Sequence, residues 1–105
     1  MTHPFSLKLS GALGLRGIEA LRGEITEALA EHEAVAIDTS AVESADASAI
    51  QLLLSAQKTA NAEGKALTLT AAGPLARALM ALGLVTADGA PLVPETSTWT
   101  IKAAA

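Results

Sequence analysis

Apolar and polar residues alternate in two stretches of the chain. Residues 5–9, FSLKL, place three apolar side chains on one face and two polar side chains on the other, and residues 65–70, KALTLT, alternate in the same way. A period of two is typical of a half-buried β-strand. Residues 34–38, AVAID, form a short apolar run, which predicts a strand buried on both faces with Asp38 at its carboxyl end.

Two shorter segments complete the predicted strands. Ser10 and Gly11 interrupt the first strand, and a second short strand or turn is expected around residues 13–15. Near the end of the chain, residues 98–101, TWTI, predict a last strand with Trp99 on one face.

Three stretches have the periodicity of amphipathic helices. In residues 18–31 the apolar side chains recur every three or four residues, and the glutamates lie mostly on the other side. Residues 75–82 repeat the pattern between Pro74, which suits a first helical turn, and Gly83, which ends the helix. Residues 47–62 form the central helix and carry two apolar stripes side by side. The main stripe consists of Ile50, Leu53, Leu54 and Ala60, and the second stripe consists of Ala45, Ala49, Leu52 and Ala56.

Strands that alternate with helices predict an α/β fold, in which helices pack on a sheet. The crossover from residues 34–38 to residues 65–70 passes through the central helix and is expected to be parallel and right-handed. A chain of 105 residues is typical of one domain, since domains of about 100–150 residues are the commonest. We therefore expect a single domain over residues 1–105, with its core in residues 5–84 and a turn-rich segment in residues 85–105.

Composition narrows the range of partners. Half of the residues are apolar but only 2% are aromatic, which predicts a closely packed aliphatic core. The net charge is −4 and the seven basic residues are scattered, so nucleic acid is not an expected partner. The longest apolar run, residues 49–54 broken by Gln51, is far shorter than the roughly 20 residues of a membrane span. The first residues, MTHPFSLKLSG, lack the pattern of a secretory signal, and we expect a cytoplasmic protein.

Metal, cofactor and catalytic chemistry find little support in the sequence. The chain has no cysteine, and its two histidines, His3 and His32, are distant and lack a third ligand. Asp38 and Asp46 are two carboxylates, but no histidine or lysine base accompanies them. A flavodoxin-like enzyme would need a glycine-rich phosphate loop after a strand, and none is present. We therefore expect no enzyme activity, no cofactor and no metal.

The polar run at residues 44–48, SADAS, leads directly into the central helix. The start of a helix leaves free N–H groups and a partial positive charge, so Asp46 is expected to cap it. The same geometry also suits a switch, because a phosphate on Ser48 would add about −1.5 to −2 charges at this end of the helix. The dipole would make this charge tolerable inside the domain while a partner surface would reject it. We accordingly expect Ser48→Asp to weaken partner binding and to leave the melting temperature nearly unchanged.

The chain resembles a STAS domain, the fold of anti-sigma-factor antagonists, over about residues 5–84. The resemblance rests on AVAIDTSAVESADASAIQLLL, on Gly64 followed by KALTL, and on PLARALMALGL. In that family a strand ends in an aspartate, matched by Asp38, and a loop leads to an Asp-Ser-Ser-Gly type motif at the start of a helix. Residues 46–49, Asp-Ala-Ser-Ala, match this motif. The resemblance implies a mixed sheet of four to five strands with helices packed on it.

The resemblance also implies a regulatory, non-catalytic protein-binding module. Such a module docks a signalling partner of the serine kinase, anti-sigma or chemotaxis type. We hypothesise that the loop at residues 39–48 and the helix at residues 47–62 form the docking surface, because the core needs only one of the two apolar stripes of this helix. The serine that a histidine-kinase-like serine kinase phosphorylates in that family is replaced by Ala47, which has no hydroxyl group. Ser48 is then the preferred candidate for phosphorylation, and Ser44 is the second. The predicted partner interface consists of Asp46, Ala47, Ser48, Ala49, Leu52 and Ala56.

The resemblance is also compatible with a second function. STAS domains without the usual phosphate acceptor occur as cytoplasmic subunits attached to the ATPase of lipid-transport ABC complexes. In that setting the same helix face would be a permanent interface.

Overall fold

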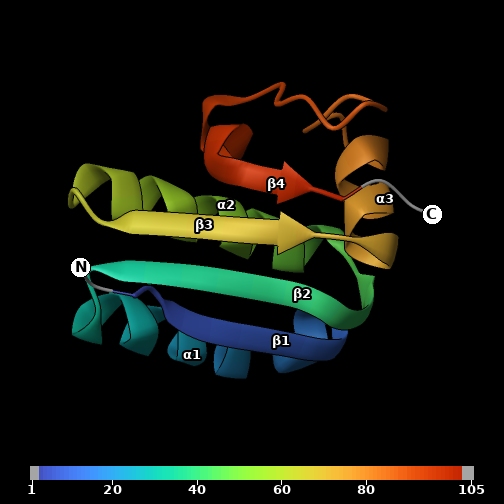
Figure 1. Ribbon diagram of the computed structural model, residues 1–105. Helices are drawn as coiled ribbons and strands as arrows, with labels where there is room; N and C mark the ends of the chain where they lie inside the picture. Colours follow the sequence, from blue (N-terminus) through green and yellow to red (C-terminus); the bar gives the residue numbers. More distant parts are fainter. Residues whose placement is uncertain (1–2, 103–105) are drawn as a thin grey trace.

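The computed structural model describes residues 3–102, in which four strands form one sheet and three α-helices pack against it (Figure 1). Two short 3-10 helices, η1 and η2, join the longer elements. The elements in chain order are β1 (Phe5–Leu13), η1 (Leu15–Gly17), α1 (Ile18–Glu31), β2 (Ala34–Ala45), α2 (Ala47–Ala62), β3 (Ala66–Ala71), α3 (Gly73–Ala81), η2 (Pro94–Thr98) and β4 (Trp99–Ile101).

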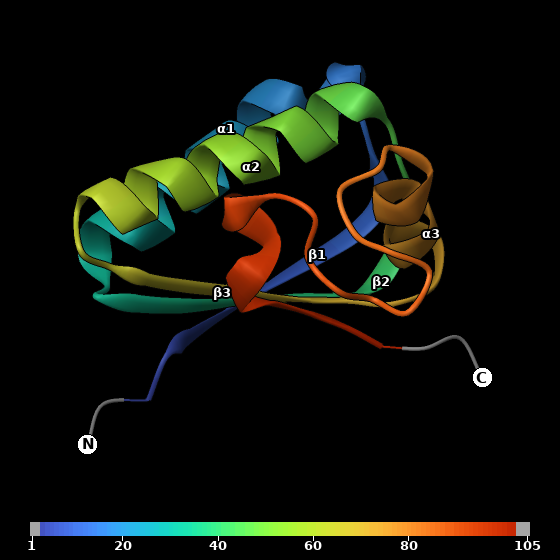
Figure 2. The same cartoon turned by 90° about the horizontal axis from the view of Figure 1, so that it is seen from above.

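The strands follow one another across the sheet in the order β1-β2-β3-β4, and all three pairings are parallel. The strand number and the α/β class are as predicted, but the implied mixed sheet is wrong. Each strand is joined to the next through a helix. The helix returns the chain to the end of the sheet where the previous strand began, so neighbouring strands are parallel. In Figure 2, α1 and α2 lie together on one face of the sheet, and α3 lies at the end where β2 and β3 finish.

β1 and β2 are longer than the sequence pattern indicates. Residues 39–45, predicted as a loop, continue β2 and pair with β1 up to Leu13↔Ala45. The predicted break at Ser10 and Gly11 is also wrong, because β1 runs through it with two register shifts. Gly11 has φ +76, a conformation that glycine adopts without strain, and it bends the strand where a side chain would resist.

α1 and α2 have the predicted bounds of residues 18–31 and 47–62. At the end of α2, Gly64 has φ +71 and the Lys65 N–H donates to the Ala60 carbonyl at 2.9 Å. At the end of α3, Gly83 has φ +74 and the Leu84 N–H donates to the Leu79 carbonyl at 3.0 Å. Both are glycine-dependent helix stops in which a late N–H satisfies a free carbonyl.

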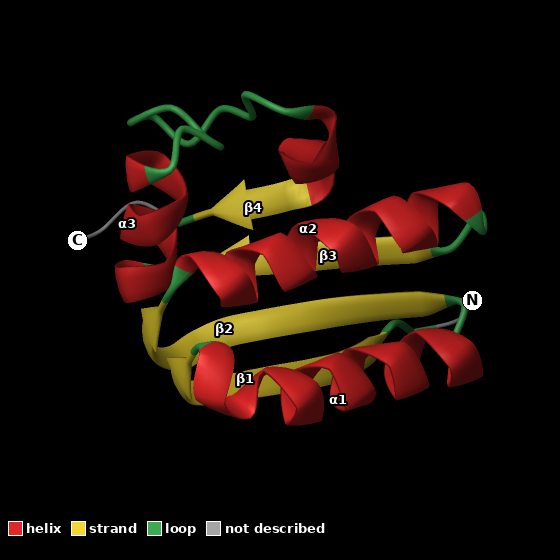
Figure 3. Cartoon of the chain, turned by 180° about the vertical axis from the view of Figure 1, so that it is seen from behind, coloured by secondary structure: helices red, strands yellow, loops and turns green. Residues whose placement is uncertain are grey.

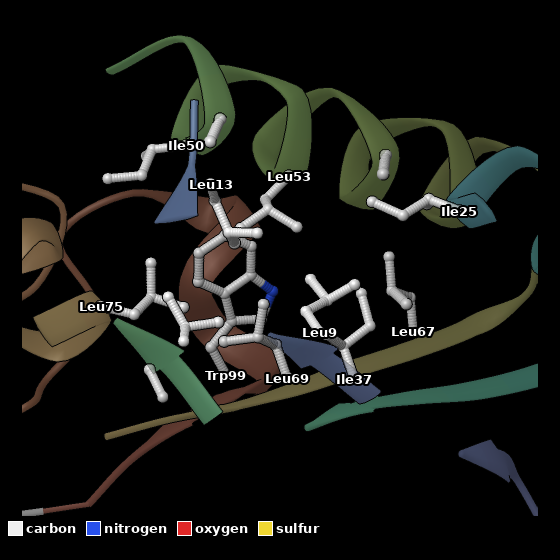
Figure 4. Packing of buried hydrophobic residues seen from close by; sticks show 14 of the residues in the cluster. Leu9, Leu13, Ile25, Ile37, Ile50, Leu53, Leu67, Leu69, Leu75 and Trp99 are labelled. Atoms are coloured by element: carbon white, nitrogen blue, oxygen red, sulfur yellow. The ribbon is translucent and has the colours of Figure 1, made fainter. Parts of the chain in front are cut away.

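The core lies between one face of the sheet and the two helices that cover it, α1 and α2. Strand register places Leu7, Ile37, Leu69 and Trp99 in one row on this face, and in Figure 4 the side chains of Leu9, Ile37, Leu67 and Leu69 point toward α2. The other face carries rows such as Lys8, Asp38, Thr70 and Thr100, and no helix of residues 3–102 covers it. β2 is therefore buried on one face, and the prediction of burial on both faces is wrong.

Gln57 ties the C-terminal segment to the core. Its side chain is 1% exposed, a position that the apolar stripes did not reveal. Its Oε1 accepts hydrogen bonds from Trp99 Nε1 at 2.8 Å and from Thr98 Oγ1 at 3.3 Å, and its Nε2 donates to Asn61 Oδ1 at 2.9 Å. Because β4 pairs with β3 at only three positions, these bonds hold the last strand against α2.

We expect Gln57→Leu to lower the free energy of unfolding by about 1–3 kcal/mol, because it leaves the buried indole N–H of Trp99 without an acceptor. Thr98 Oγ1 keeps the Leu67 carbonyl as an acceptor at 3.1 Å. Urea denaturation followed by circular dichroism measures this change. The matched control is Gln51→Leu, an exposed position on the same helix, which we expect to change stability by less than about 0.5 kcal/mol. Equal losses in the two variants would contradict the assignment.

Candidate functional site

The amino-terminal end of α2 is organised by the carboxylate of Asp46. Asp46 is the N-cap residue, with extended backbone angles of φ −97 and ψ 177. Its Oδ1 accepts from the Ala49 N–H at 3.1 Å and from Ser48 Oγ at 2.6 Å, and its Oδ2 accepts from the Leu15 N–H at 3.1 Å. The predicted cap is therefore present, and the same side chain also fastens the turn after β1 to the start of α2.

Gly14 and Leu15 belong to this site, although the sequence does not point to them. A Cβ at Gly14 would lie 2.6 Å from Asp46 Oδ2, so only glycine leaves room for the carboxylate. Leu15 follows at the start of η1 with its side chain 72% exposed. Both residues are more than 30 positions from Asp46 along the chain. Local sequence patterns do not predict a contact at that separation.

The hydrogen bonds lower the pKa of Asp46. The Ser48 hydroxyl has the largest effect and the Ala49 N–H the next largest, because both stabilise the ionised carboxylate. A carboxylate whose pKa is lower in the folded than in the unfolded chain adds stability above the unfolded pKa. That contribution is lost as the pH falls through the folded pKa.

The predicted interface residues divide into two groups. Asp46, Ala47 and Ser44 are exposed, and Ser48 and Leu52 are partly exposed. Ala49 is fully buried and Ala56 is 8% exposed, so the prediction that they supply a free contact surface is wrong. The reason is the orientation of α2, which turns the face with Ala49, Leu53, Ala56 and Ala60 toward the core.

The Ser48 hydroxyl is engaged within the domain, since it donates to Asp46. A phosphate on this oxygen would remove the donor and place acceptor oxygens and negative charge beside the carboxylate. The repulsion opposes the favourable effect of the helix dipole. The geometry therefore argues against our expectation that a negative charge at Ser48 leaves stability nearly unchanged.

A shallow hollow of about 400 Å³ lies beside this helix start. The end of β1 and η1 form one side of it, including Leu15 and Arg16, and Ser44 and Asp46 lie on the other. The hollow thus presents an exposed leucine beside a serine hydroxyl, and the exposed Ala47 follows Asp46 at the start of α2.

Asp38 and Asp46 do not form a carboxylate pair. Asp38 lies on the uncovered face of the sheet, where it accepts a hydrogen bond from the Ser40 N–H at 2.9 Å. This bond is the main cause of a lowered pKa at Asp38, and the charges of Lys8 and Lys102 add smaller effects. β2 continues to residue 45 beyond it, and at about 3.3 Å per residue the two aspartates are roughly 20 Å or more apart.

The remaining candidates lie outside this site. His32 stacks on Phe5, with ring centroids 4.2 Å apart, at the opposite end of the strands. Within residues 3–102 no group of three acidic, histidine or cysteine side chains is placed to hold a metal ion. No helix in the described part of the chain is long and apolar enough to cross a membrane.

A family model described as "Mlab, STAS domain" matches residues 2–94. The chain therefore belongs to the STAS domain family, whose α/β fold agrees with the four-stranded parallel sheet and three helices. No curated protein matches the chain.

We expect Asp46→Asn to be less stable than the wild type at pH 7, because the amide can still cap the helix but lacks the charge that Ser48 and the N–H groups stabilise. The difference should shrink as the pH falls from about 4 through the lowered pKa of Asp46, where the wild-type carboxylate becomes protonated. Thermal unfolding from pH 2 to pH 7 measures it. Glu43→Gln, an exposed acid on β2, is the control, and a difference that persists at pH 2 would contradict the charge argument.

We expect Gly14→Ala to destabilise the protein by about 1–2 kcal/mol, since the added methyl group must displace the Asp46 carboxylate. Gly17→Ala is the matched control, because nothing lies within 4 Å of a Cβ at Gly17. Removing one glycine from the unfolded chain should leave that variant as stable as the wild type or slightly more so. Chemical denaturation of the two variants measures the difference, and equal stability would show that the close approach has no cost.

Proposed function

We propose that this protein is a non-catalytic module that docks a protein partner through the amino-terminal end of α2. The docking surface is defined by the exposed or partly exposed residues around the cap, namely Leu15, Ser44, Asp46, Ala47, Ser48 and Leu52. The observation that carries the proposal is the Asp46 carboxylate, which holds both the turn of Leu15 and the first turn of α2.

This arrangement supplies what a docking surface needs. Leu15 is a large apolar side chain at 72% exposure, and its own backbone N–H is bonded to Asp46. A surface that is already ordered loses little conformational entropy when a partner binds. Ala47, the first residue of α2, is exposed, and its small side chain gives a partner close access to the start of the helix.

The geometry favours a permanent interface over a phosphate switch. Ala47 has no hydroxyl group where regulated relatives are phosphorylated, and the Ser48 hydroxyl is bonded to Asp46 at 2.6 Å. Both observations support the function of a cytoplasmic STAS subunit that stays attached to the ATPase of a lipid-transport ABC complex. In this function the docking surface buries uncharged residues and one carboxylate that is already hydrogen-bonded.

The second candidate is an anti-sigma-factor antagonist-like regulator that docks a serine kinase, an anti-sigma factor or a chemotaxis protein. The exposed Ser44 supports it, because its hydroxyl lines the hollow beside the docking surface. A phosphate on Ser44 would change the charge of the surface without removing the Ser48–Asp46 bond.

Photo-crosslinking tests the docking surface. We expect p-benzoylphenylalanine at position 47 to give a covalent adduct with a partner in living cells. The same group at Lys58, an exposed position three turns along the same helix, should give none. Mass spectrometry of the adduct identifies the partner, and an ATPase subunit supports the permanent interface while a kinase or other signalling protein supports the second candidate. Adducts of equal yield at the two positions would contradict the proposal.

Serine substitutions with copurification separate the two modes of docking. For a permanent subunit, Ser44→Ala and Ser48→Ala should retain the partner, and intact mass should show an unphosphorylated chain. Phosphate on Ser44, together with partner release, would instead establish the regulated mode. In either mode we expect Ser48→Asp to lower the melting temperature, because it places a second carboxylate beside Asp46.

A further inference from the structure

β1 is an outer strand of the sheet, and no strand within residues 3–102 pairs with its other side (Figure 3). Its register with β2 is regular from Phe5 to Lys8 and shifts on both sides of Ser10 and Gly11. The first half of β1 therefore offers a regular row of free backbone N–H and C=O groups, to which another extended chain can bind.

The flank of α1 above this edge is acidic. Glu24, Glu27 and Glu31 recur at intervals of three and four residues and so share one side of the helix. They line a hollow of about 250 Å³ together with Phe5, Leu7, Lys8, Ala28 and His32. The opposite flank of α1, with Arg22, Thr26 and Ala30, faces α2 instead. The hollow thus runs between the free edge of β1 and a row of three carboxylates.

These carboxylates have no cationic partner in the described structure. The only ion pair within residues 3–102 joins Arg22 to Glu19 on another part of α1. Like charges three and four residues apart destabilise a helix slightly, so the row costs stability. The three glutamates are also not placed to hold a metal ion.

We propose that the β1 edge and the acidic flank of α1 form a groove that binds an extended basic segment of a protein partner. The segment adds a strand beside residues 5–8 and lays an apolar side chain over Phe5, which is 39% exposed, and Leu7. Its lysine or arginine side chains meet Glu24, Glu27 and Glu31. Charge disfavours a second copy of this chain as the occupant, because a copy would bring three glutamates and only one lysine, Lys8, in its own groove.

The groove is separate from the docking surface of α2. Phe5 and His32 lie where the strands begin, whereas Asp46 and Leu15 lie where β1 and β2 end. The proposals for the two surfaces can therefore be tested independently of each other.

A synthetic peptide of four Val-Lys repeats, labelled with a fluorophore, is the probe. We expect it to bind the full-length protein in fluorescence anisotropy titrations at low salt and to bind less tightly as salt is added. A peptide of four Gly-Lys repeats has the same charge but lacks apolar side chains and strand propensity. We expect it to bind about tenfold more weakly, and equal binding of the two peptides would show that only bulk charge attracts them.

Charge reversal in the groove supplies the matched variants. Glu27→Lys should weaken binding of the Val-Lys peptide about tenfold, because it replaces an attraction with a repulsion of similar size. Glu63→Lys makes the same change of net charge at an exposed position after α2. Compared at about 0.15 M salt, where charges more than about 8 Å apart are largely screened, it should leave affinity within about twofold of the wild type. Equal losses in the two variants would overturn the assignment of the groove.

Amide hydrogen exchange tests strand addition itself. We expect the bound Val-Lys peptide to slow exchange at residues 5–9 of β1 and to leave the start of α2 unchanged. Binding without protection of β1 would overturn strand addition. Sedimentation of the protein alone should show a monomer across the concentrations used, and a dimer with a protected β1 would assign the edge to a second copy instead.

Discussion

The carboxylate of Asp46 is the contact on which the candidate docking site depends. It accepts hydrogen bonds from the helix that follows it and from the backbone of Leu15, which stands 31 positions earlier. One side chain therefore defines where α2 starts, where the chain leaves β1, and how an exposed leucine sits beside the helix tip. Gly14 permits this contact, because any larger residue would occupy the space of the carboxylate.

The parallel sheet determines which ends of the elements meet. Because β1 and β2 are parallel, their carboxyl ends lie at the same end of the sheet, and the connections to α1 and α2 begin there. The proposed docking surface is built from these two strand-to-helix connections. The acidic groove lies toward the other end of β1, next to the end of α1. A small domain can in this way offer two surfaces that do not compete for space.

The structure limits what chemistry Ser48 can carry. The Ser48 hydroxyl donates to the Asp46 carboxylate at 2.6 Å and is already part of the helix cap. A negative charge on Ser48 would therefore repel Asp46 within the domain, whether or not a partner is bound. The position of the family's phosphate acceptor is held by Ala47. The STAS fold is thus retained here with a helix tip whose serine hydroxyl already serves the cap.

Local periodicity was enough to predict α1, α2 and the class of the fold, because helix stripes, capping aspartate and stop glycines all act within a few residues. Asp46 was predicted as a cap for the same reason. The extension of β2 over residues 39–45 was missed, because small polar residues become a strand there only by pairing with β1. Only the tertiary structure decided that Ala49 and Ala56 are buried, that Gln57 receives the indole of Trp99, and that Leu15 lies against Asp46. These contacts join residues distant in the chain, and the sequence carries no periodic signal for such pairs.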